Sequence, residues 1–391
     1  MITDTAALLI VLVAVVVGVF LISSLKPLRG FFRYFPPVIW LYFVPMFLST
    51  AGILPAEHPL YAIMARFLLP IALVLLTLST DLKAISSVGP QALMALAAGA
   101  VGVTLGCLFA CVLLQSSLPD NGWQGLSLLS ATWIGGSANL VAMQQSLNAD
   151  PVLVGFIVVA DSIIAYSWLG FVVVLSAHQS RMNAWFRADE GILDRVENVV
   201  RDSERPAKPV STYSICVMLG GALLVAYLAR LAGEALPAIG SPPIITATTW
   251  AILITVSLGL ILSGSQIGRA AREYRAAEYA YASMFLLFTS VGAQADLRAV
   301  TEAPVFLVAG MVVMTFHVGV LMGVCRWRRL PAFFFAVGST ANIGGATSAS
   351  IAATAFRPSL TAIGALLGIA GYIIGVYLPI GIASMLAALA A

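Results

Sequence analysis

The chain has 391 residues, of which 60% are hydrophobic and only 9% are charged, and its mean hydropathy is +1.00. Soluble domains carry roughly 25% charged residues, so this composition excludes a soluble globular protein. The net charge of +3 is small, and the basic residues lie in predicted loops, which argues against nucleic-acid binding. The four cysteines, Cys107, Cys111, Cys216 and Cys325, have no metal-binding spacing.

Apolar segments near the ~20 residues that span the hydrocarbon of a bilayer follow one another along the chain. The N-terminal residues before the first segment lack the basic region of a signal peptide, so this segment is expected to remain as a helix. The pattern predicts an all-α polytopic membrane protein. The twelve segments cover about residues 6–23, 36–53, 60–79, 91–114, 124–146, 152–177, 212–232, 244–263, 277–293, 303–324, 331–352 and 359–388.

One connection is much longer than the others and carries charges of both signs. Its apolar residues have the spacing of an amphipathic helix that lies on a membrane surface. This linker, residues 178–211, divides the chain into a first transmembrane half, 1–177, and a second, 212–391. The apolar residues are Trp185, Phe186, Ile192, Leu193, Val196, Val199 and Val200.

A small and polar island interrupts the fifth apolar segment at residues 131–139 and the eleventh at 338–348. The first contains Ile134-Gly135-Gly136 and the second Ile343-Gly344-Gly345, each among hydroxyl and amide side chains. Paired glycines in such a setting predict a break in the helix. Inside a membrane the freed backbone is tolerated only where it faces protein or water. Two breaks in corresponding halves of a chain are typical of a transporter's binding site.

The breaks belong to a longer internal repeat. Residues 75–85 parallel 290–300, and 161–166 parallel 371–376, in the same order around the two motifs. Internal repeats of this size are typical of secondary transporters. The two repeats cover about residues 36–177 and 244–388.

Loops rich in arginine and lysine indicate that the repeats have opposite orientations. The basic loops at 26–33, 269–275 and 326–329 are expected to face the cytoplasm. The second segment then starts inside and its partner, the eighth, starts outside. This inversion requires an even number of crossings between residues 177 and 244, where only one span is evident, so the number of crossings stays open.

Asp161 lies in the middle of the sixth apolar segment, directly after the first interrupted one. An intramembrane carboxylate costs at least ~2.5–3.5 kcal/mol to insert, so it is a functional candidate. Burial disfavours the charged form of this carboxylate, whereas the positive ends of nearby interrupted helices favour it. A carboxylate under both effects could load and release H⁺ or Na⁺. The alternative is a carboxylate that a neighbouring hydroxyl or amide satisfies and that serves only helix packing.

The interrupted segments supply the other candidate residues. Thr132, Asn139 and Asn342 are predicted to coordinate the coupling ion with Asp161, which is also the candidate Na⁺ site. Free N–H groups at half-helix N-termini suit a carboxylate on a substrate. The alternative is that small residues only let helices approach closely, and the duplication of the motif favours a site. The predicted substrate-binding residues are Gly135, Gly136, Ser137, Ser339, Thr340, Gly344, Gly345 and Ser348.

Other polar residues carry less weight. His317 is expected to be a hydrogen-bonded packing residue, and Arg66 either to reach the membrane interface or to face an anion. Gln144 and Gln145 are expected near an entrance. The chain contains no phosphate-binding loop, zinc-protease motif or nucleophile elbow, so we expect neither an enzyme nor a cofactor. Uphill transport would then depend on an ion gradient.

Residues 131–139 and 339–345 resemble the motifs of the YjcL-like family of bacterial and plastid membrane proteins, over nearly the whole chain. That family is similar, at a distance, to cation:proton antiporters and sodium/bile-acid symporters. The resemblance implies inverted repeats, a panel domain, and a core domain in which two broken helices cross. It places Asp161 at the ion-binding aspartate of the antiporters. Gly371 stands where antiporters often carry a basic residue, which favours ion-coupled solute uptake.

These features predict a multi-pass secondary active transporter of the bacterial inner membrane. It would couple H⁺ or Na⁺ to symport of a small organic anion or a peptide, for which the resemblance suggests a cell-wall origin. A core made of the third to sixth and ninth to twelfth segments would rock or move as an elevator, and distant relatives suggest a homodimer through the panel helices. The alternatives are a monovalent cation:proton antiporter and a membrane receptor or scaffold without transport activity.

Overall fold

The computed structural model of the chain describes residues 2–189, 191–193, 212–295 and 304–390, most of them in helices. These residues form no strand, only an isolated bridge between Ile239 and Ile245. Each of the twelve predicted segments corresponds to helix, and two are divided at their glycine motifs. Within the described ranges, seven helices are long and apolar enough to cross a membrane, or nine if each of two bent pairs is one span. The prediction of an all-α polytopic membrane protein is confirmed.

The chain folds into two compact units, each assembled from separate pieces of both halves. Unit 1 comprises Met1–Thr80, Gln144–Ser162 and Ala207–Pro304, and unit 2 comprises Asp81–Met143, Ile163–Pro206 and Val305–Ala391. The predicted halves therefore describe the order of the repeats, whereas the compact bodies are interleaved. Unit 2 holds both glycine motifs and is smaller than the predicted core, because the third and ninth segments pack in unit 1.

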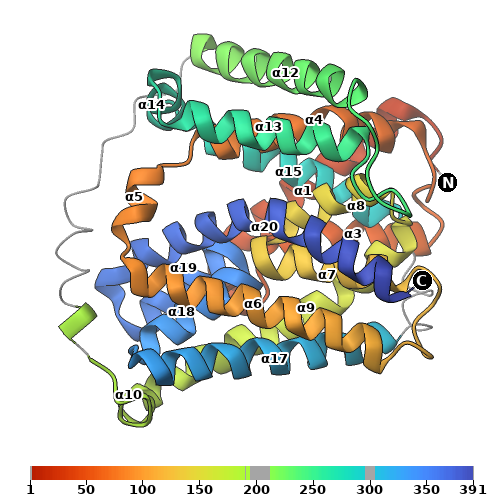
Figure 1. The fold of residues 1–391 in the computed structure, drawn as a ribbon. Coiled ribbons are helices and arrows are strands. Elements are labelled where there is room, and N and C mark those ends of the chain that lie inside the picture. The colour runs from red at the N-terminus through yellow and green to blue at the C-terminus, as the bar shows by residue number, and fades with distance from the viewer. Residues whose placement is uncertain (1, 190, 194–211, 296–303, 391) are drawn as a thin grey trace. The chain divides into compact units, whose positions relative to one another are not determined.

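Unit 1 is a bundle in which glycines permit close helix contacts (Figure 1). A Cβ on Gly292 would lie 2.2 Å from the carbonyl oxygen of Tyr42, and one on Gly259 would lie 1.9 Å from Oγ1 of Thr77. Small residues at helix interfaces are the usual basis of packing in membranes. Its helices are α1 (Thr5–Ser24), α2 (Arg29–Tyr34), α3 (Pro37–Thr50), α4 (Pro59–Leu78), α12 (Thr212–Glu234), α13 (Ala247–Ser263), α14 (Gln266–Glu273) and α15 (Ala276–Ala293), with the 3₁₀ turn η1 (Lys26–Leu28).

Unit 2 contains α5 (Leu82–Ser87), α6 (Pro90–Leu113), α7 (Gly122–Gly135), α10 (Gln179–Phe186), α17 (Val305–Arg328), α18 (Ala332–Ile343), α19 (Gly345–Phe356) and α20 (Thr361–Ala390), with the 3₁₀ turns η2 (Ser176–His178) and η4 (Pro358–Leu360). Two further helices have residues in both units. These are α8 (Ser137–Leu147) and α9 (Pro151–Leu175).

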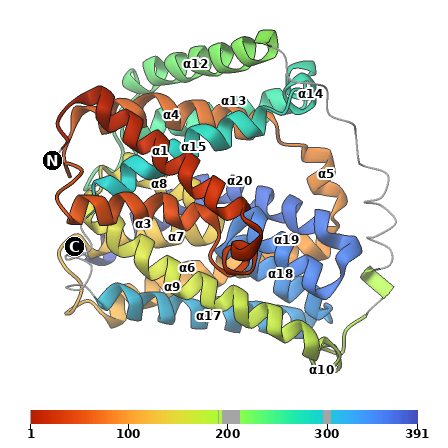
Figure 2. The same cartoon turned by 180° about the vertical axis from the view of Figure 1, so that it is seen from behind.

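The equivalent helices α6 and α17 lie side by side in unit 2 and run antiparallel (Figures 1 and 2). Gly102 of α6 faces His317, where an added Cβ would lie 2.6 Å from the Cα atom. Gly106, further along α6, faces Val313, which is earlier in α17. Antiparallel packing of equivalent helices is the arrangement that inverted repeats predict.

The second interrupted segment is a helical hairpin. α18 and α19 pack against each other, and both pack against α20 (Figure 1). The start of α18 is fixed by the Asn183 side chain of α10, which accepts a 2.7 Å hydrogen bond from the Ala332 N–H. α19 packs against the neighbouring turn η2. The chain reverses direction between α18 and α19 at Gly345, whose φ of +66° is a conformation that other residues rarely adopt.

The described part of the linker packs on unit 2. Phe186, Ile192 and Leu193 are buried in its core, whereas Trp185 is 53% exposed and lies next to Arg326. An amphipathic helix over the whole linker, residues 178–211, stays a prediction. Val196, Val199 and Val200, and the repeat landmark at 296–300, lie outside the described residues.

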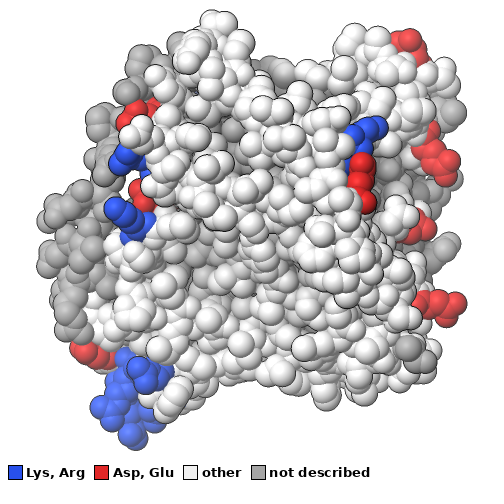
Figure 3. All heavy atoms as spheres, turned by 45° about the horizontal axis from the view of Figure 1, so that its top comes forward, with Lys and Arg blue, Asp and Glu red and all other residues white. Residues whose placement is uncertain are grey.

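The exposed surface has the character of a lipid-facing protein. Ile10, Leu21, Val174, Leu224 and Ile261 are all more than half exposed. On the face drawn in Figure 3, charged side chains gather in small groups near the edges and leave wide neutral areas between them. In hydrocarbon such apolar side chains are the favourable choice, because charged groups are costly there.

Candidate binding site where two helix breaks meet

Helix α20 carries a stripe of glycines that organises unit 2. Gly364, Gly368, Gly371 and Gly375 are spaced by four, three and four residues, so they share one face of the helix. Gly364 and Gly368 face α19, with an added Cβ 2.4 Å from the Ala349 carbonyl oxygen and 2.2 Å from the Ala346 nitrogen, respectively. Gly375 faces the end of α7, where an added Cβ would lie 2.6 Å from the Cα atom of Gly135. The stripe therefore contacts both interrupted segments.

Each break is made by glycine in a conformation that other residues rarely adopt. Gly136 has a φ of +86° and its N–H donates to the Thr132 carbonyl at 2.7 Å, which ends α7. Gly345 has a φ of +66°, and the preceding Gly344 N–H donates to the Thr340 carbonyl at 2.9 Å. The first residues of α8 and α19 follow directly. The predicted interruptions at Gly135–Gly136 and Gly344–Gly345 are present in the structure.

The two breaks meet at Gly371. A Cβ placed on Gly371 would lie 3.0 Å from the carbonyl oxygen of Ile134 and 3.1 Å from that of Ala341. Ile134 is the last residue but one of α7, and Ala341 the last but two of α18. The C-terminal carbonyls of both interrupted helices therefore point at one position of α20. A side chain there would lie between these oxygens, and the carbonyl groups would have to move to make room for it.

Both motifs place a buried asparagine at this meeting point. Asn342 is 0% exposed, and its Nδ2 donates to the carbonyls of Leu96 at 2.9 Å and Gly338 at 3.0 Å. Asn139 is 1% exposed, and its Nδ2 donates to the Tyr372 carbonyl at 2.9 Å. Because carbonyl oxygens only accept, these bonds determine which end of each amide is nitrogen.

The oxygen atoms of both amides remain without a hydrogen-bond partner. The Oδ1 atoms of Asn139 and Asn342 are buried and accept no hydrogen bond. A buried acceptor left unsatisfied costs about 1–3 kcal/mol, so two of them in equivalent motifs call for an explanation. A cation or a hydrogen-bond donor of a bound ligand would satisfy an oxygen of this kind.

A hydrogen-bonded chain connects four helices, α6, α9, α17 and α18, beside this point. His317 is 0% exposed, with Nδ1 3.0 Å from the Gly99 carbonyl and Nε2 2.8 Å from the Ser339 hydroxyl. The carbonyl accepts, so Nδ1 carries the proton and Nε2 accepts from Ser339. The Ser339 hydroxyl also accepts from the Trp168 indole N–H at 2.8 Å. His317 is therefore a hydrogen-bonded packing residue, as its isolation in the sequence indicates.

The remaining motif residues are divided between the break and the surrounding packing. Thr132 and Thr340 are buried, and Thr340 donates to the Ala336 carbonyl of its own helix at 2.8 Å. Ser137 begins α8 and is half-buried. Ser348 is 5% exposed, and a Cβ on Gly344 would lie 2.1 Å from its hydroxyl. The sequence did not indicate Gly99, Leu96 or Gly375, although the glycine spacing of α20 could have identified the last.

Asp161 occupies the position on α9 that Gly371 occupies on α20. Each lies ten residues after the first residue of its helix, Pro151 and Thr361. Ten residues correspond to about 15 Å along a helix, or about half of the ~30 Å hydrocarbon thickness. Asp161 is half-buried and makes an interaction within the protein. Its part in ion binding stays a prediction.

The meeting point combines two kinds of polar group. Carbonyl oxygens of Ile134 and Ala341 and the amide oxygens of Asn139 and Asn342 are acceptors only, which are the ligands that hard cations prefer. The first turns of α8 and α19 contribute N–H groups of the opposite polarity. Among the described residues, no group of three or more His, Cys, Asp and Glu side chains could hold a transition metal.

Comparison with known proteins places the chain in a family of membrane proteins. The family model described as "Protein of unknown function (DUF819)" matches residues 7–389. The chain is also 26% identical over 355 residues to the uncharacterized membrane protein YjcL of Bacillus subtilis (strain 168), which covers 85% of each chain. The resemblance inferred from the two glycine motifs is confirmed. The chain is a member of the DUF819 family of membrane proteins, similar to YjcL over most of its length.

Proposed function

We propose that this protein is a secondary active transporter that couples Na⁺ or H⁺ to the movement of a small organic anion or peptide across the bacterial inner membrane. The proposal rests mainly on one observation. Two interrupted helices from the two repeats meet at Gly371, and each brings a buried asparagine whose Oδ1 has no partner. Unpartnered acceptors cost free energy in a protein without a ligand, so they favour a site that is filled during function.

The acceptor-only set favours Na⁺ as the coupling ion. Two backbone carbonyls and two amide oxygens offer oxygen ligands without a fixed negative charge. Such a site binds a monovalent cation weakly enough to release it, which transport requires. The N–H groups at the starts of α8 and α19 would then attract the carboxylate of a solute, so ion and solute would favour each other's binding.

Asp161 would provide the charge that couples the ion to movement. It is a carboxylate inside an apolar span, and such residues usually mark ion pathways. Trp168, which donates to Ser339, lies seven residues after Asp161 and therefore on the same face of α9. Protonation of the Asp161 carboxylate, or Na⁺ binding to it, would thus change the position of α9. Through the hydrogen bond of Trp168, this change would reach Ser339 of the second motif.

Transport in proteoliposomes tests the proposal. Labelled organic anions and short peptides are offered to vesicles with an inward Na⁺ gradient, an inward H⁺ gradient, or neither. We expect accumulation only with a gradient, and loss of that accumulation in Asp161→Asn and Asn139→Ala with normal insertion of both variants. A non-transporting receptor or scaffold would show no uptake of any solute in any vesicle and would retain its activity as Asp161→Asn.

A monovalent cation:proton antiporter is the second candidate, because the same oxygen atoms could hold Na⁺ without a solute. It predicts that an imposed Na⁺ gradient moves protons in the opposite direction with no solute added. A pH-sensitive dye inside the vesicles distinguishes the two. Sodium-driven alkalinisation or acidification without solute favours the antiporter, and solute-dependent sodium entry favours the symporter.

A further inference from the structure

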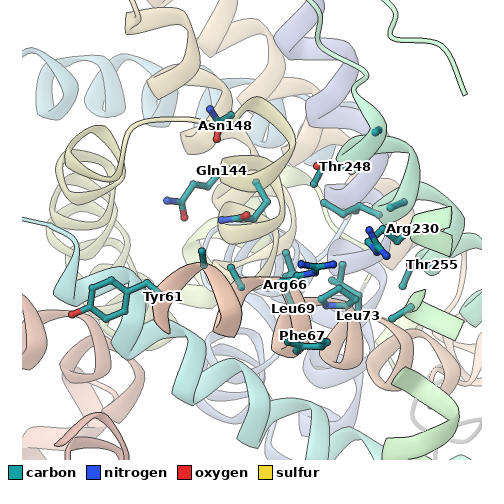
Figure 4. A pocket seen from close by; sticks show the side chains of 18 of the residues that line it. Tyr61, Arg66, Phe67, Leu69, Leu73, Gln144, Asn148, Arg230, Thr248 and Thr255 are labelled. Carbon is teal, nitrogen blue, oxygen red and sulfur yellow. The ribbon is translucent and has the colours of Figure 1, made fainter. Parts of the chain in front are cut away.

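Unit 1 contains a large cavity of about 1010 Å³ that no part of the Gly371 site uses. Every residue that lines it belongs to unit 1. Its walls are one face of α4, from His58 to Leu73, and the facing sides of α12 and α13 (Figure 4). Fifteen residues of helix correspond to about 22 Å, so the cavity extends along most of the ~30 Å hydrocarbon thickness. A cavity of this length suits an elongated molecule.

Two arginines line this cavity. Arg66 of α4 and Arg230 of α12 both line it, and their guanidinium groups face the space between the helices (Figure 4). The end of α12 meets the start of α13, since a Cβ on Gly233 would lie 2.5 Å from the Ala247 carbonyl oxygen. α12 and α13 are therefore joined at this point and pack together against α4.

The two arginines differ in their partners. Arg230 forms an ion pair with Glu234 at 2.5 Å, one turn further along α12. Arg66 is exposed to the cavity and, in the part of the chain that the structure describes, pairs with no carboxylate; it lies 5.9 Å from the ring of Phe67. An arginine in an apolar span without a counter-ion is costly. A negatively charged ligand group would supply that counter-ion through a bidentate contact.

Gln144 adds an independent indication of a ligand. It is 4% exposed, lines the cavity, and its Oε1 has no hydrogen-bond partner (Figure 4). Its segment is held on unit 1, because the hydroxyl of Thr249 donates to the Ser146 carbonyl at 3.3 Å. A buried amide held in place with an unsatisfied oxygen needs a donor such as a hydroxyl group.

Much of the cavity wall is apolar. The exposed apolar side chains among its lining residues include Phe67 of α4 and Leu223 and Leu224 of α12. Burying an acyl chain against such side chains gains about 0.8 kcal/mol for each CH₂ group. The cavity thus combines groups for a charged head that carries hydroxyl groups with apolar side chains for a hydrocarbon tail.

We propose that this cavity binds an anionic amphiphile, with a phosphate-type head beside Arg66 and Arg230, a head-group hydroxyl at Gln144, and an acyl chain along Leu223 and Leu224. A phosphoglycerol lipid has this chemistry. The source of the head group is either the membrane or a soluble glycerol phosphate, and the test separates them. The site lies in unit 1 and does not depend on transport.

The test measures binding of three probes to the purified full-length protein in neutral detergent by native mass spectrometry. The probes are dioleoyl phosphatidylglycerol, dioleoyl phosphatidylcholine with the same tails, and glycerol phosphate with the head alone. We expect phosphatidylglycerol to bind at least tenfold more tightly than phosphatidylcholine, and Arg66→Gln to weaken phosphatidylglycerol binding at least tenfold. Arg269→Gln, the same charge change at an exposed position of α14, should alter it less than twofold.

Ala62→Phe is a second variant that fills the cavity without changing its charge, since Ala62 is exposed and lines it. It should also weaken phosphatidylglycerol binding at least tenfold. Binding of glycerol phosphate that depends on Arg66 would support the anion site and assign it to a soluble ligand. The proposal would be overturned if the two lipids bound equally tightly, or if neither Arg66→Gln nor Ala62→Phe weakened phosphatidylglycerol binding. Because no gradient is involved, these outcomes leave the transport proposal untouched.

Discussion

Replacing Asn342 by alanine separates a binding role from a structural one, because the two roles predict opposite changes in stability. The variant loses the Nδ2 hydrogen bonds to Leu96 and Gly338. Side-chain hydrogen bonds inside membrane proteins average about 0.6 kcal/mol, so their loss costs about 1.2 kcal/mol. The variant also removes the unpartnered Oδ1, which relieves about 1–3 kcal/mol. The ligand-free stability should therefore change by no more than about 2 kcal/mol.

The ligand-bound state should respond much more strongly. At a Na⁺ concentration one hundred times the dissociation constant, binding stabilises the wild type by about 2.7 kcal/mol, and the variant should lose this stabilisation. Thermal unfolding in detergent can be followed with a thiol-reactive dye, because Cys107 and Cys325 are fully buried. The exposed Cys216 is first changed to serine.

The comparison is made in NaCl and in choline chloride at equal ionic strength, with Gln266→Ala as a control at an exposed amide. We expect a Na⁺-dependent rise in unfolding temperature for the wild type and the control, and none for Asn342→Ala. If Asn342→Ala were strongly destabilised in choline and kept the full Na⁺ effect, the amide would be a structural element and the reasoning would be refuted.

Three further predictions follow from the packing of unit 2. Gly371→Ala should abolish gradient-driven uptake and cost about 1–3 kcal/mol, because its Cβ would lie near 3 Å from two carbonyl oxygens; retained uptake would exclude a site there. Gly102→Ala should reduce the yield of monodisperse protein in size-exclusion chromatography, since its Cβ would lie 2.6 Å from the His317 Cα, whereas Gly319→Ala on α17 meets no atom within 4 Å and should be neutral. His317→Ala should lower the unfolding temperature by leaving the Ser339 hydroxyl without its acceptor, and His317→Gln should recover part of that loss; equal losses in both variants would argue against the hydrogen-bonded chain.

Several features of this protein could be predicted from its sequence, because they depend on local composition. Apolar segments long enough to cross a membrane must be helical, since only helices or closed barrels satisfy the backbone in lipid. All twelve segments are helical in the structure. The breaks at Gly136 and Gly345 could also be predicted, because paired glycines among polar residues act on their own part of the backbone. Family membership followed from the same motifs.

The tertiary structure decided which residues come together. α18 and α19 fold back as a hairpin and both pack against the glycine face of α20. The pattern of apolar residues in the sequence does not indicate whether such a segment crosses the membrane or folds back. The partner of each asparagine amide is a carbonyl on a distant helix, so only the packed helices leave the Oδ1 atoms of Asn139 and Asn342 without partners. Long-range contacts depend on the three-dimensional fit of surfaces, whereas helix formation and breaking depend on neighbours along the chain. For this reason the sequence located the breaks, and the fold determined that they meet at Gly371.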